Sequence, residues 1–337
     1  MGQGTAAIRT LADLARLAGV STGTVSRALS NKTTVNPVTG DRIRALAAAY
    51  AFHPNQMASR LRKGCTGVVG VVVPLGHEHS QRLSDPFFMA LLGHLADELT
   101  ARGYEVMLSR VIPDSDDWLD RIVGSGMLDG VLLVGQSDQF DTIERVAAQY
   151  RPLVAWGEHR PGQRHCAIGV DNRSGGRLAG EALIRRGRRN LAFLGECRTP
   201  ELAARYAGLC DAAASAGLAL PLQLDTHLAT AAMSSQIAAH LDHLSHAIDG
   251  VAAASDVIAM QLLRLLADRN IAVPDTVSVT GFDDLPLSEQ TVPRLTTIRQ
   301  DIVRGASLMV ATLIARMSGH DEPTDRLIPL LIERDSA

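Results

Sequence analysis

The chain has 337 residues, enough for two or three domains, and is 46% hydrophobic and 20% charged, as in an ordinary globular protein. It has no apolar run of the roughly 18 residues that cross a membrane and no pattern typical of a signal peptide, so we expect a cytoplasmic protein. Its four cysteines lack metal-ligand spacing, and we expect neither a metal nor a cofactor.

Charge is divided unevenly along the chain. Residues 1–63 contain nine Lys and Arg but only two Asp and Glu, a net charge of +7. Because the whole chain carries −3, residues 64–337 carry −10. A basic N-terminal segment joined to an acidic body is typical of a DNA-binding domain attached to a domain of another kind.

The first predicted elements are two short helices separated by a tight turn, within residues 10–30. Apolar residues recur there at helical spacing, Thr10 and Ser21 can cap the two helices, and Gly19 can end the first. This pattern is that of a helix-turn-helix. Its second helix would present small or basic groups to a major groove. The candidate DNA-contacting residues are Ser21, Thr22, Gly23, Ser26 and Arg27.

A third helix is predicted to begin at Asn36-Pro37, a cap followed by a proline at the first helical position. Behind it stands the segment Pro54-Asn-Gln-Met-Ala-Ser-Arg-Leu. With Thr10-Leu-Ala-Asp-Leu-Ala, Gly19-Val-Ser and Thr24-Val-Ser-Arg-Ala-Leu, this segment resembles the LacI/GalR family of bacterial transcription regulators. The resemblance extends over nearly the full length of the chain.

The resemblance implies a homodimer that places two heads on a pseudo-palindromic operator in double-stranded DNA. Residues 8–54 would form the helix-turn-helix domain and residues 55–64 a hinge helix that forms on specific DNA. Asn55 would contact DNA, Leu61 would wedge into the central minor-groove step, and Arg62 would follow the groove. Residues 65–337 would form the ligand-binding and dimerisation domain. No C-terminal heptad run is present, so we expect a dimer.

From residue 66 onward, strands and helices alternate. Strands are expected at residues 67–73, 104–108, 129–134, 153–156, 167–170, 190–194, 250–254 and 277–281. This alternation predicts two doubly wound parallel-sheet subdomains facing a cleft. The resemblance implies the periplasmic-binding-protein type. The first subdomain would hold residues 66–164 and 295–324, and the second residues 165–294 and 325–334.

The resemblance also implies where an effector would bind, and the residue chemistry fits. Arg205 would offer a fixed fork of donors, and Asp283 would accept hydrogen bonds at the carboxyl end of a strand. The aromatic rings would stack on the ligand. Ser255 replaces an asparagine that is common in the family. Whether Ser255 forms the hydrogen bonds to a ligand that the asparagine would form is left undecided. The full candidate ligand set is Asp85, Phe87, Phe88, Trp156, Arg205, Ser255 and Asp283.

Other interpretations of these residues remain. Each aromatic ring is about equally compatible with core packing. Asp283 could be a cap or turn residue, and Arg205 could form a surface ion pair. Three histidines between His240 and His246 could bind a metal, but a solvated helix face is the better interpretation. The role of the loop between Gly76 and Arg82 stays open.

The sequence therefore predicts a repressor whose operator affinity is controlled by a small effector, a sugar or sugar derivative. A ligand-dependent activator or a corepressor-type regulator is the alternative. An enzyme is less favoured because no P-loop, nucleophile elbow or His-Glu-x-x-His motif is present. A sugar-binding carrier would lack the basic head.

Overall fold

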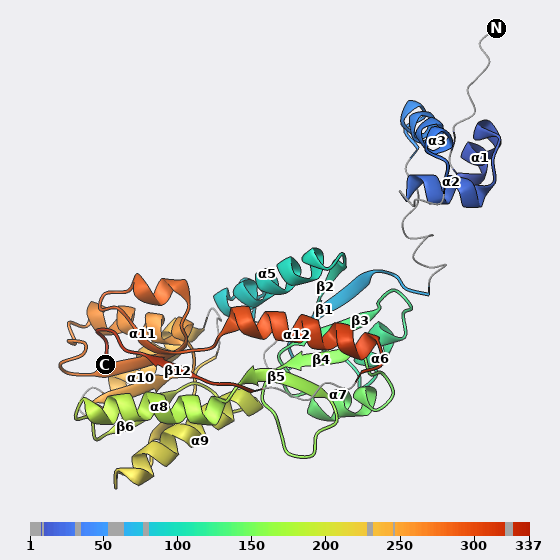
Figure 1. Ribbon diagram of the computed structural model, residues 1–337. Helices are drawn as coiled ribbons and strands as arrows, with labels where there is room; N and C mark the ends of the chain where they lie inside the picture. The colour runs from blue at the N-terminus through green and yellow to red at the C-terminus, as the bar shows by residue number, and fades with distance from the viewer. Residues whose placement is uncertain are drawn as a thin grey trace. The chain divides into compact units, whose positions relative to one another are not determined.

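The computed structural model describes residues 8, 10–30, 35–52, 64–76, 81–227, 232–244, 247–320 and 326–337 (Figure 1). These residues belong to two units, Met1–Gly67 and Val68–Ala337. The predicted hinge contacts Asn55, Leu61 and Arg62 lie outside the described residues, as does most of the loop between Gly76 and Arg82.

The head contains three helices: α1 (Leu11–Ala18), α2 (Thr22–Leu29) and α3 (Pro37–Ala49). The expected caps are confirmed. Thr10 and Asp13 form a reciprocal capping box, the Ser21 hydroxyl accepts from the Thr24 amide, and Gly19 ends α1 at φ 65°. The local sequence therefore determines where α1 and α2 begin and where α1 ends, because each cap satisfies backbone groups that the helix leaves free.

Arginines on α3 complete the head by reaching back to the other two helices. Arg42 donates to the Ala18 carbonyl at 2.7 Å, and Arg44 donates to the Ala28 carbonyl at 3.1 Å. Both carbonyls lie in the last turns of their helices, where intrahelical partners are missing and a positive charge is favourable. The three helices also enclose a small core: Leu14, Ala15, Ala18, Val25, Ala28, Ile43, Ala47 and Phe52.

The first subdomain of the body is built on a six-stranded parallel sheet. In spatial order its strands are β11 (Arg326–Leu327), β5 (Cys166–Val170), β4 (Leu153–Trp156), β3 (Gly130–Val134), β1 (Val68–Pro74) and β2 (Glu105–Val111). Its helices are α5 (Pro86–Ala101), α6 (Trp118–Val123), α7 (Phe140–Ala147) and α12 (Ile302–Met317). Figure 1 shows α5 and α12 side by side on this subdomain, in agreement with their extensive contact.

Both faces of this sheet are covered, as the β-branched run in β1 predicts. Val69 and Val71 belong to the core that contains α5 and α12, whereas Val72 belongs to a separate core with Trp118 and Ile143. Successive side chains of a strand point to opposite faces, so a strand apolar at every position requires helices on both sides.

The second subdomain repeats this plan around another six-stranded sheet. Its strands in spatial order are β12 (Leu330–Ile332), β10 (Thr296–Arg299), β9 (Ser278–Asp283), β8 (Gly250–Ala253), β6 (Leu191–Leu194) and β7 (Leu222–Leu224). Only β12 runs antiparallel to its neighbour among the described strands. Its helices are α8 (Asn172–Arg185), α9 (Pro200–Ser215), α10 (Met233–Leu244) and α11 (Asp256–Asp268), with a 3₁₀ turn at Pro286–Glu289. The expected fold class is confirmed.

Helices α8 and α9 approach each other closely because glycines lie where they meet. A Cβ on Gly176 would lie 1.9 Å from the Arg205 carbonyl oxygen, and one on Gly208 would lie 1.9 Å from the Arg173 carbonyl oxygen. No side chain fits at either position. This packing fixes the position of Arg205, which projects from α9 toward the cleft.

The points at which the chain crosses between subdomains differ from the expected ones. We expected crossings near His165, after Pro293 and near residue 325. Instead β5 pairs with β4 in the first sheet, β10 pairs with β9 in the second, and β11 pairs with β5 in the first. The chain therefore crosses after each of these strands. A strand this short has no feature that specifies one sheet over the other, so the pairing partners decide its place.

Candidate DNA surface and ligand cleft

Helix α2 presents the predicted DNA-contacting residues on its exposed side. Thr22, Gly23 and Arg27 are exposed and Ser26 is half-buried, whereas Val25 and Ala28 are buried against the rest of the head. Ser21 is also exposed, but its hydroxyl already bonds the Thr24 amide and hydroxyl. The surface matches that of a recognition helix, and the individual base contacts stay predictions.

All seven predicted ligand residues line one cavity between the two subdomains. Its volume is about 110 Å³. A water molecule needs only about 10–15 Å³ on such a measure, so the cavity has room for a ligand of several heavy atoms. The residues concerned are Asp85, Phe87, Phe88, Trp156, Arg205, Ser255 and Asp283. Their contact with an effector stays a prediction.

Arg205 is held from several sides in the wall of this cavity. Its Nε donates to Asn172 Oδ1 at 2.9 Å, and one terminal nitrogen donates to the Ala254 carbonyl. The guanidinium carbon also lies 3.7 Å from the centroid of the Phe282 ring, a cation–π contact. Arg205 is only 8% exposed, so it is not a surface ion pair. Its donors therefore have a fixed direction before any ligand arrives.

Asp283 ends β9 and lies opposite Arg205 in the cavity. Its carboxylate accepts from Gln300 Nε2 at 2.6 Å, and its backbone has a φ of 122°. Burial raises the pKa of Asp283 to about 7, against the opposing effects of Arg205 and Gln300. The buried Asp256 behind it has a raised pKa for the same reason, and Asp283 raises that pKa further.

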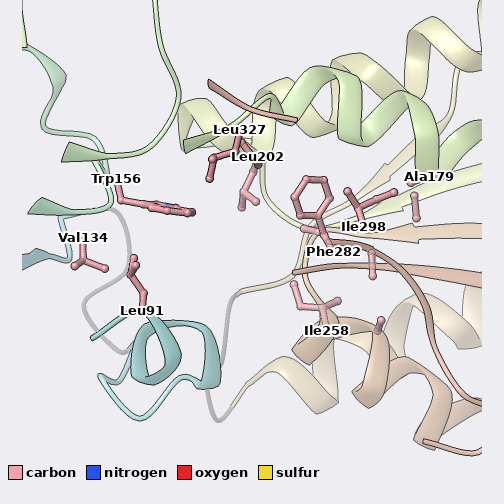
Figure 2. Close-up of a cluster of buried hydrophobic side chains, with 14 of the residues drawn as sticks. Leu91, Val134, Trp156, Ala179, Leu202, Ile258, Phe282, Ile298 and Leu327 are labelled. Carbon is pink, nitrogen blue, oxygen red and sulfur yellow. The ribbon is translucent and has the colours of Figure 1, made fainter. Parts of the chain in front are cut away.

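The opposite wall combines aromatic rings with a carboxylate. The ring centroids of Phe87 and Trp156 lie 6.0 Å apart, and those of Phe87 and Phe88 also lie 6.0 Å apart. Figure 2 shows Trp156 extending from its strand toward Leu202 of α9 in the other subdomain. Asp85 accepts from the Phe87 amide at 2.9 Å and caps α5. These rings pack against one another and also line the cavity, and their stacking on a ligand stays a prediction.

Ser255 lines the cavity, but its side chain is already engaged. It is the N-cap of α11, and its hydroxyl accepts from the Ile258 amide at 3.3 Å. A hydroxyl that accepts one bond can still donate another. With serine in place of asparagine, the side chain at this position caps α11 and its hydroxyl can still donate one hydrogen bond to a ligand.

Sequence reasoning missed several polar residues of the cavity. These are Gln81, Gln136, Ser137, Thr199, Glu201 and Gln300. Gln136 and Ser137 follow β3 directly, at the same sheet edge as Trp156, and that position was a usable signal. Glu201 precedes Arg205 by one helical turn and shares its face of α9. Gln300 gave no local signal, because it lies beside Asp283 only through the pairing of β10 with β9.

The described residues contain no helix long and apolar enough to cross a membrane. In the same part of the chain, no three His, Cys, Asp or Glu side chains are grouped so that they could hold a metal ion. Of the three histidines considered above, His240 contacts the Asp225 carbonyl at 2.7 Å. The His243 side chain and the whole of His246 lie outside the described part.

Comparison with known proteins accounts for both units. Residues 10–55 match the family described as "Bacterial regulatory proteins, lacI family", and residues 181–337 match the periplasmic binding protein-like domain. The sucrose operon repressor of Streptococcus mutans serotype c is 26% identical over 326 residues, 95% of this chain and 96% of that protein. The regulator GalS of Salmonella typhimurium is 29% identical over 336 residues, 97% of this chain and 96% of that protein.

The chain combines the DNA-binding domain of the lacI family with a periplasmic binding protein-like domain, and it is similar to LacI-family regulators over nearly its whole length. It is a DNA-binding transcriptional regulator, as its head indicated. Among solved LacI-family structures, a CelR–cellobiose complex is 26% identical with a TM-score of 0.68, covering 98% of this chain and 100% of that one. The lac repressor dimer bound to operator and the anti-inducer ONPF is 21% identical with a TM-score of 0.85, covering 97% and 98%. The latter shows the shared fold.

Proposed function

We propose that this regulator is a repressor whose operator affinity is controlled by a carbohydrate or carbohydrate derivative in the cavity between the subdomains. The observation that carries the proposal is the polar lining of that cavity. Gln81 Oε1 and Gln136 Oε1 are buried and have no hydrogen-bond partner among the described residues. Buried acceptors normally find a donor, and ligand hydroxyl groups would supply it.

The rest of the wall suits the same class of ligand. Arg205 and Asp283 offer a donor and an acceptor to neighbouring hydroxyls, and Trp156 offers an aromatic face to the apolar side of a sugar ring. Two solved relatives support this class. One structure is a complex with cellobiose, and a LacI-family regulator from Enterococcus faecium carries bound ribose at 25% identity, with a TM-score of 0.68 and coverage of 80% of this chain and 98% of that chain.

The proposed assembly is a homodimer on a pseudo-palindromic operator. Apolar side chains are exposed at the edge strand of each sheet: Leu108 on β2, with Met89 on the adjacent α5, and Leu222 on β7. Exposed apolar edge strands are usually covered by a partner, and a second copy would cover both edges. The lac repressor structure is that of a dimer on its operator.

In this proposal the effector changes the angle between the subdomains and hence the spacing of the two heads. Such coupling is commonly worth about 1–3 kcal/mol. The protein would act in the cytoplasm and would not be an enzyme. The hinge contacts Asn55, Leu61 and Arg62 remain part of the proposal.

A gel shift of the full chain on the DNA that flanks its own gene tests this function. Excess non-specific DNA is included, and the assay is repeated with a panel of sugars. A discrete shift that one sugar removes supports an inducible repressor, and a shift that a sugar strengthens indicates a corepressor. A specific shift that no carbohydrate alters would contradict the proposed effector class, and absence of any specific site in an unbiased selection would contradict the operator proposal.

A further inference from the structure

The wall of the ligand cavity contains more carboxyl groups than cations. Three carboxyl groups line it, those of Asp85, Glu201 and Asp283, and among the lining residues Arg205 is the one cation. Asp85 also caps α5 and Asp283 faces Arg205, so both have structural partners. Glu201 remains as a carboxyl group whose pKa burial raises, because the opposing effect of Arg205 offsets the burial only in part.

Glu201 is held at the cavity by backbone rather than by a cation. Its Oε1 accepts from the Glu158 amide at 3.3 Å, and no ion pair involves it among the described residues. Glu201 lies in the first turn of α9, where the helix dipole favours a negative charge. A Cβ on Gly157 would lie 2.6 Å from its Oε1, so the glycine provides the space it occupies. The fold thus places a carboxyl group here that has no ion pair among the described residues, and a bound cation would stabilise its charged form.

The unpartnered amide oxygens point to the same chemistry independently. Gln136 is fully buried, and its Nε2 donates to the Glu158 carbonyl at 2.7 Å, which fixes its Oε1 as a free acceptor. Gln81 is likewise buried, its Nε2 faces Asp85 at 3.5 Å, and its Oε1 has no partner within the described part. The cavity therefore offers acceptors in excess, and a ligand rich in donors satisfies them.

Resting on the carbohydrate site proposed above, we infer that the effector is an amino sugar whose protonated amine pairs with Glu201. An ammonium group brings three donors and one positive charge, whereas each hydroxyl of a neutral sugar brings one donor and no charge. Pairing a partly buried carboxylate with a cation avoids the cost of leaving it desolvated and unbalanced. The ring hydroxyls would still meet Arg205 and Asp283.

The test uses three compounds that differ at one substituent: D-glucosamine, N-acetyl-D-glucosamine and D-glucose, with the matching galactose series. Each is titrated calorimetrically into the full chain at neutral pH. We expect at least one free amine to bind at least about tenfold more tightly than its neutral counterparts, because the charge-assisted pair is lost in both of them.

Two variants assign that preference to Glu201. Glu201→Gln keeps the shape and should lower affinity for the amine at least about tenfold while leaving the neutral sugars within about threefold. Glu181→Gln removes an exposed carboxylate of α8 that pairs with Arg177 and should change neither. An unchanged midpoint of urea unfolding, followed by tryptophan fluorescence, shows that the body of each variant is folded, because Trp118 and Trp156 both lie in it.

The outcomes separate this inference from the proposed function. Equal or tighter binding of the neutral sugars, or binding by none of the six compounds, overturns the amino-sugar inference. A preference for the amine that survives in Glu201→Gln also overturns it, since another group would then bind the amine. An operator shift that responds to a different carbohydrate leaves the proposed function standing in each case.

Discussion

Arg205 Nη1 and Asp283 Oδ1 lie 3.8 Å apart in one wall of the ligand cavity. The two charges attract at this distance, but a direct hydrogen bond needs a closer approach. Arg205 is anchored by Asn172 and Ala254, and Asp283 by Gln300. The pair is therefore held slightly open by its other partners. A ligand hydroxyl placed between them could donate to the carboxylate and accept from the guanidinium.

This relationship predicts the effect of removing the arginine. Arg205→Ala should abolish the response of the operator complex to its effector while sparing operator affinity, because the head lies in a separate unit. It should also destabilise the body by about 1–3 kcal/mol, since Asn172 Oδ1 and the Ala254 carbonyl stay buried without their donor. Gel shifts with and without effector measure the first effect, and urea unfolding followed by tryptophan fluorescence measures the second.

The matched control is Arg177→Ala on α8, an exposed arginine paired with Glu181 one turn away. It should alter neither property by more than about 0.5 kcal/mol. An effector response retained by Arg205→Ala would remove Arg205 from the site.

The raised pKa of Asp283 predicts a pH dependence of stability. The unfolded chain releases this proton near the ordinary pKa of an aspartate, 3.8, whereas the folded chain holds it up to about pH 7. The contribution of Asp283 to stability is therefore complete below pH 3.8 and is lost as the pH rises toward 7. Asp283→Asn mimics the protonated form, so its gain in unfolding free energy over the original chain should grow from pH 4 to pH 8. A difference between the two proteins that does not change with pH would contradict the assignment.

Arg27 is predicted to contact a base edge from the exposed face of α2. Arg27→Ala should weaken operator binding by about 1–3 kcal/mol and relax specificity at one base pair of each half-site. The control is Arg16→Ala on α1, an exposed arginine that pairs with Asp13 at 3.3 Å. Titrating each protein variant onto the operator and onto operators mutated at single base pairs measures both the affinity and the specificity. Equal losses on specific and non-specific DNA would show that Arg27 contacts phosphate alone.

Replacing Gly23 by alanine should make α2 more stable but weaken DNA binding. A Cβ there would meet nothing closer than Ser21 Oγ at 3.7 Å, so alanine fits the isolated head. Gly23→Ala should stabilise α2 by about 1 kcal/mol, measured by hydrogen exchange of its amides. It should weaken operator binding, because the methyl group adds bulk on the predicted groove-facing side. Unchanged operator affinity would place Gly23 away from the DNA.

Replacing Gly208, where α8 and α9 meet, should destabilise the protein, in contrast to the stabilisation expected for Gly23→Ala. Gly208→Ala forces a methyl group to within 1.9 Å of the Arg173 carbonyl oxygen. The helices must separate, which should cost about 3 kcal/mol or more and displace Arg205 from the cavity. Tryptophan fluorescence reports this change specifically, because Trp118 and Trp156 both lie in the body. A Gly208→Ala variant as stable as the original chain would refute the close contact.

The sequence by itself determined the head and the elements of the body. Thr10, Gly19, Ser21 and Asn36 act through bonds to residues two to four positions away, so their caps can be predicted locally. The alternation of apolar strands and amphipathic helices was equally local, and it gave the doubly wound fold class. The seven cavity residues followed because strand ends and the family resemblance both pointed to one cleft.

Tertiary structure alone decided which sheet each strand joins and which polar groups complete the cavity. The strands β5, β10 and β11 are too short for their sequences to specify a partner, and hydrogen bonding to a neighbouring strand decided their places. Gln300 reaches Asp283 only through such a pairing. The electrostatic surroundings of Glu201 likewise depend on three separate segments, those of Asp85, Arg205 and Asp283. These groups come together only after folding, so no local sequence pattern predicts their combined charge.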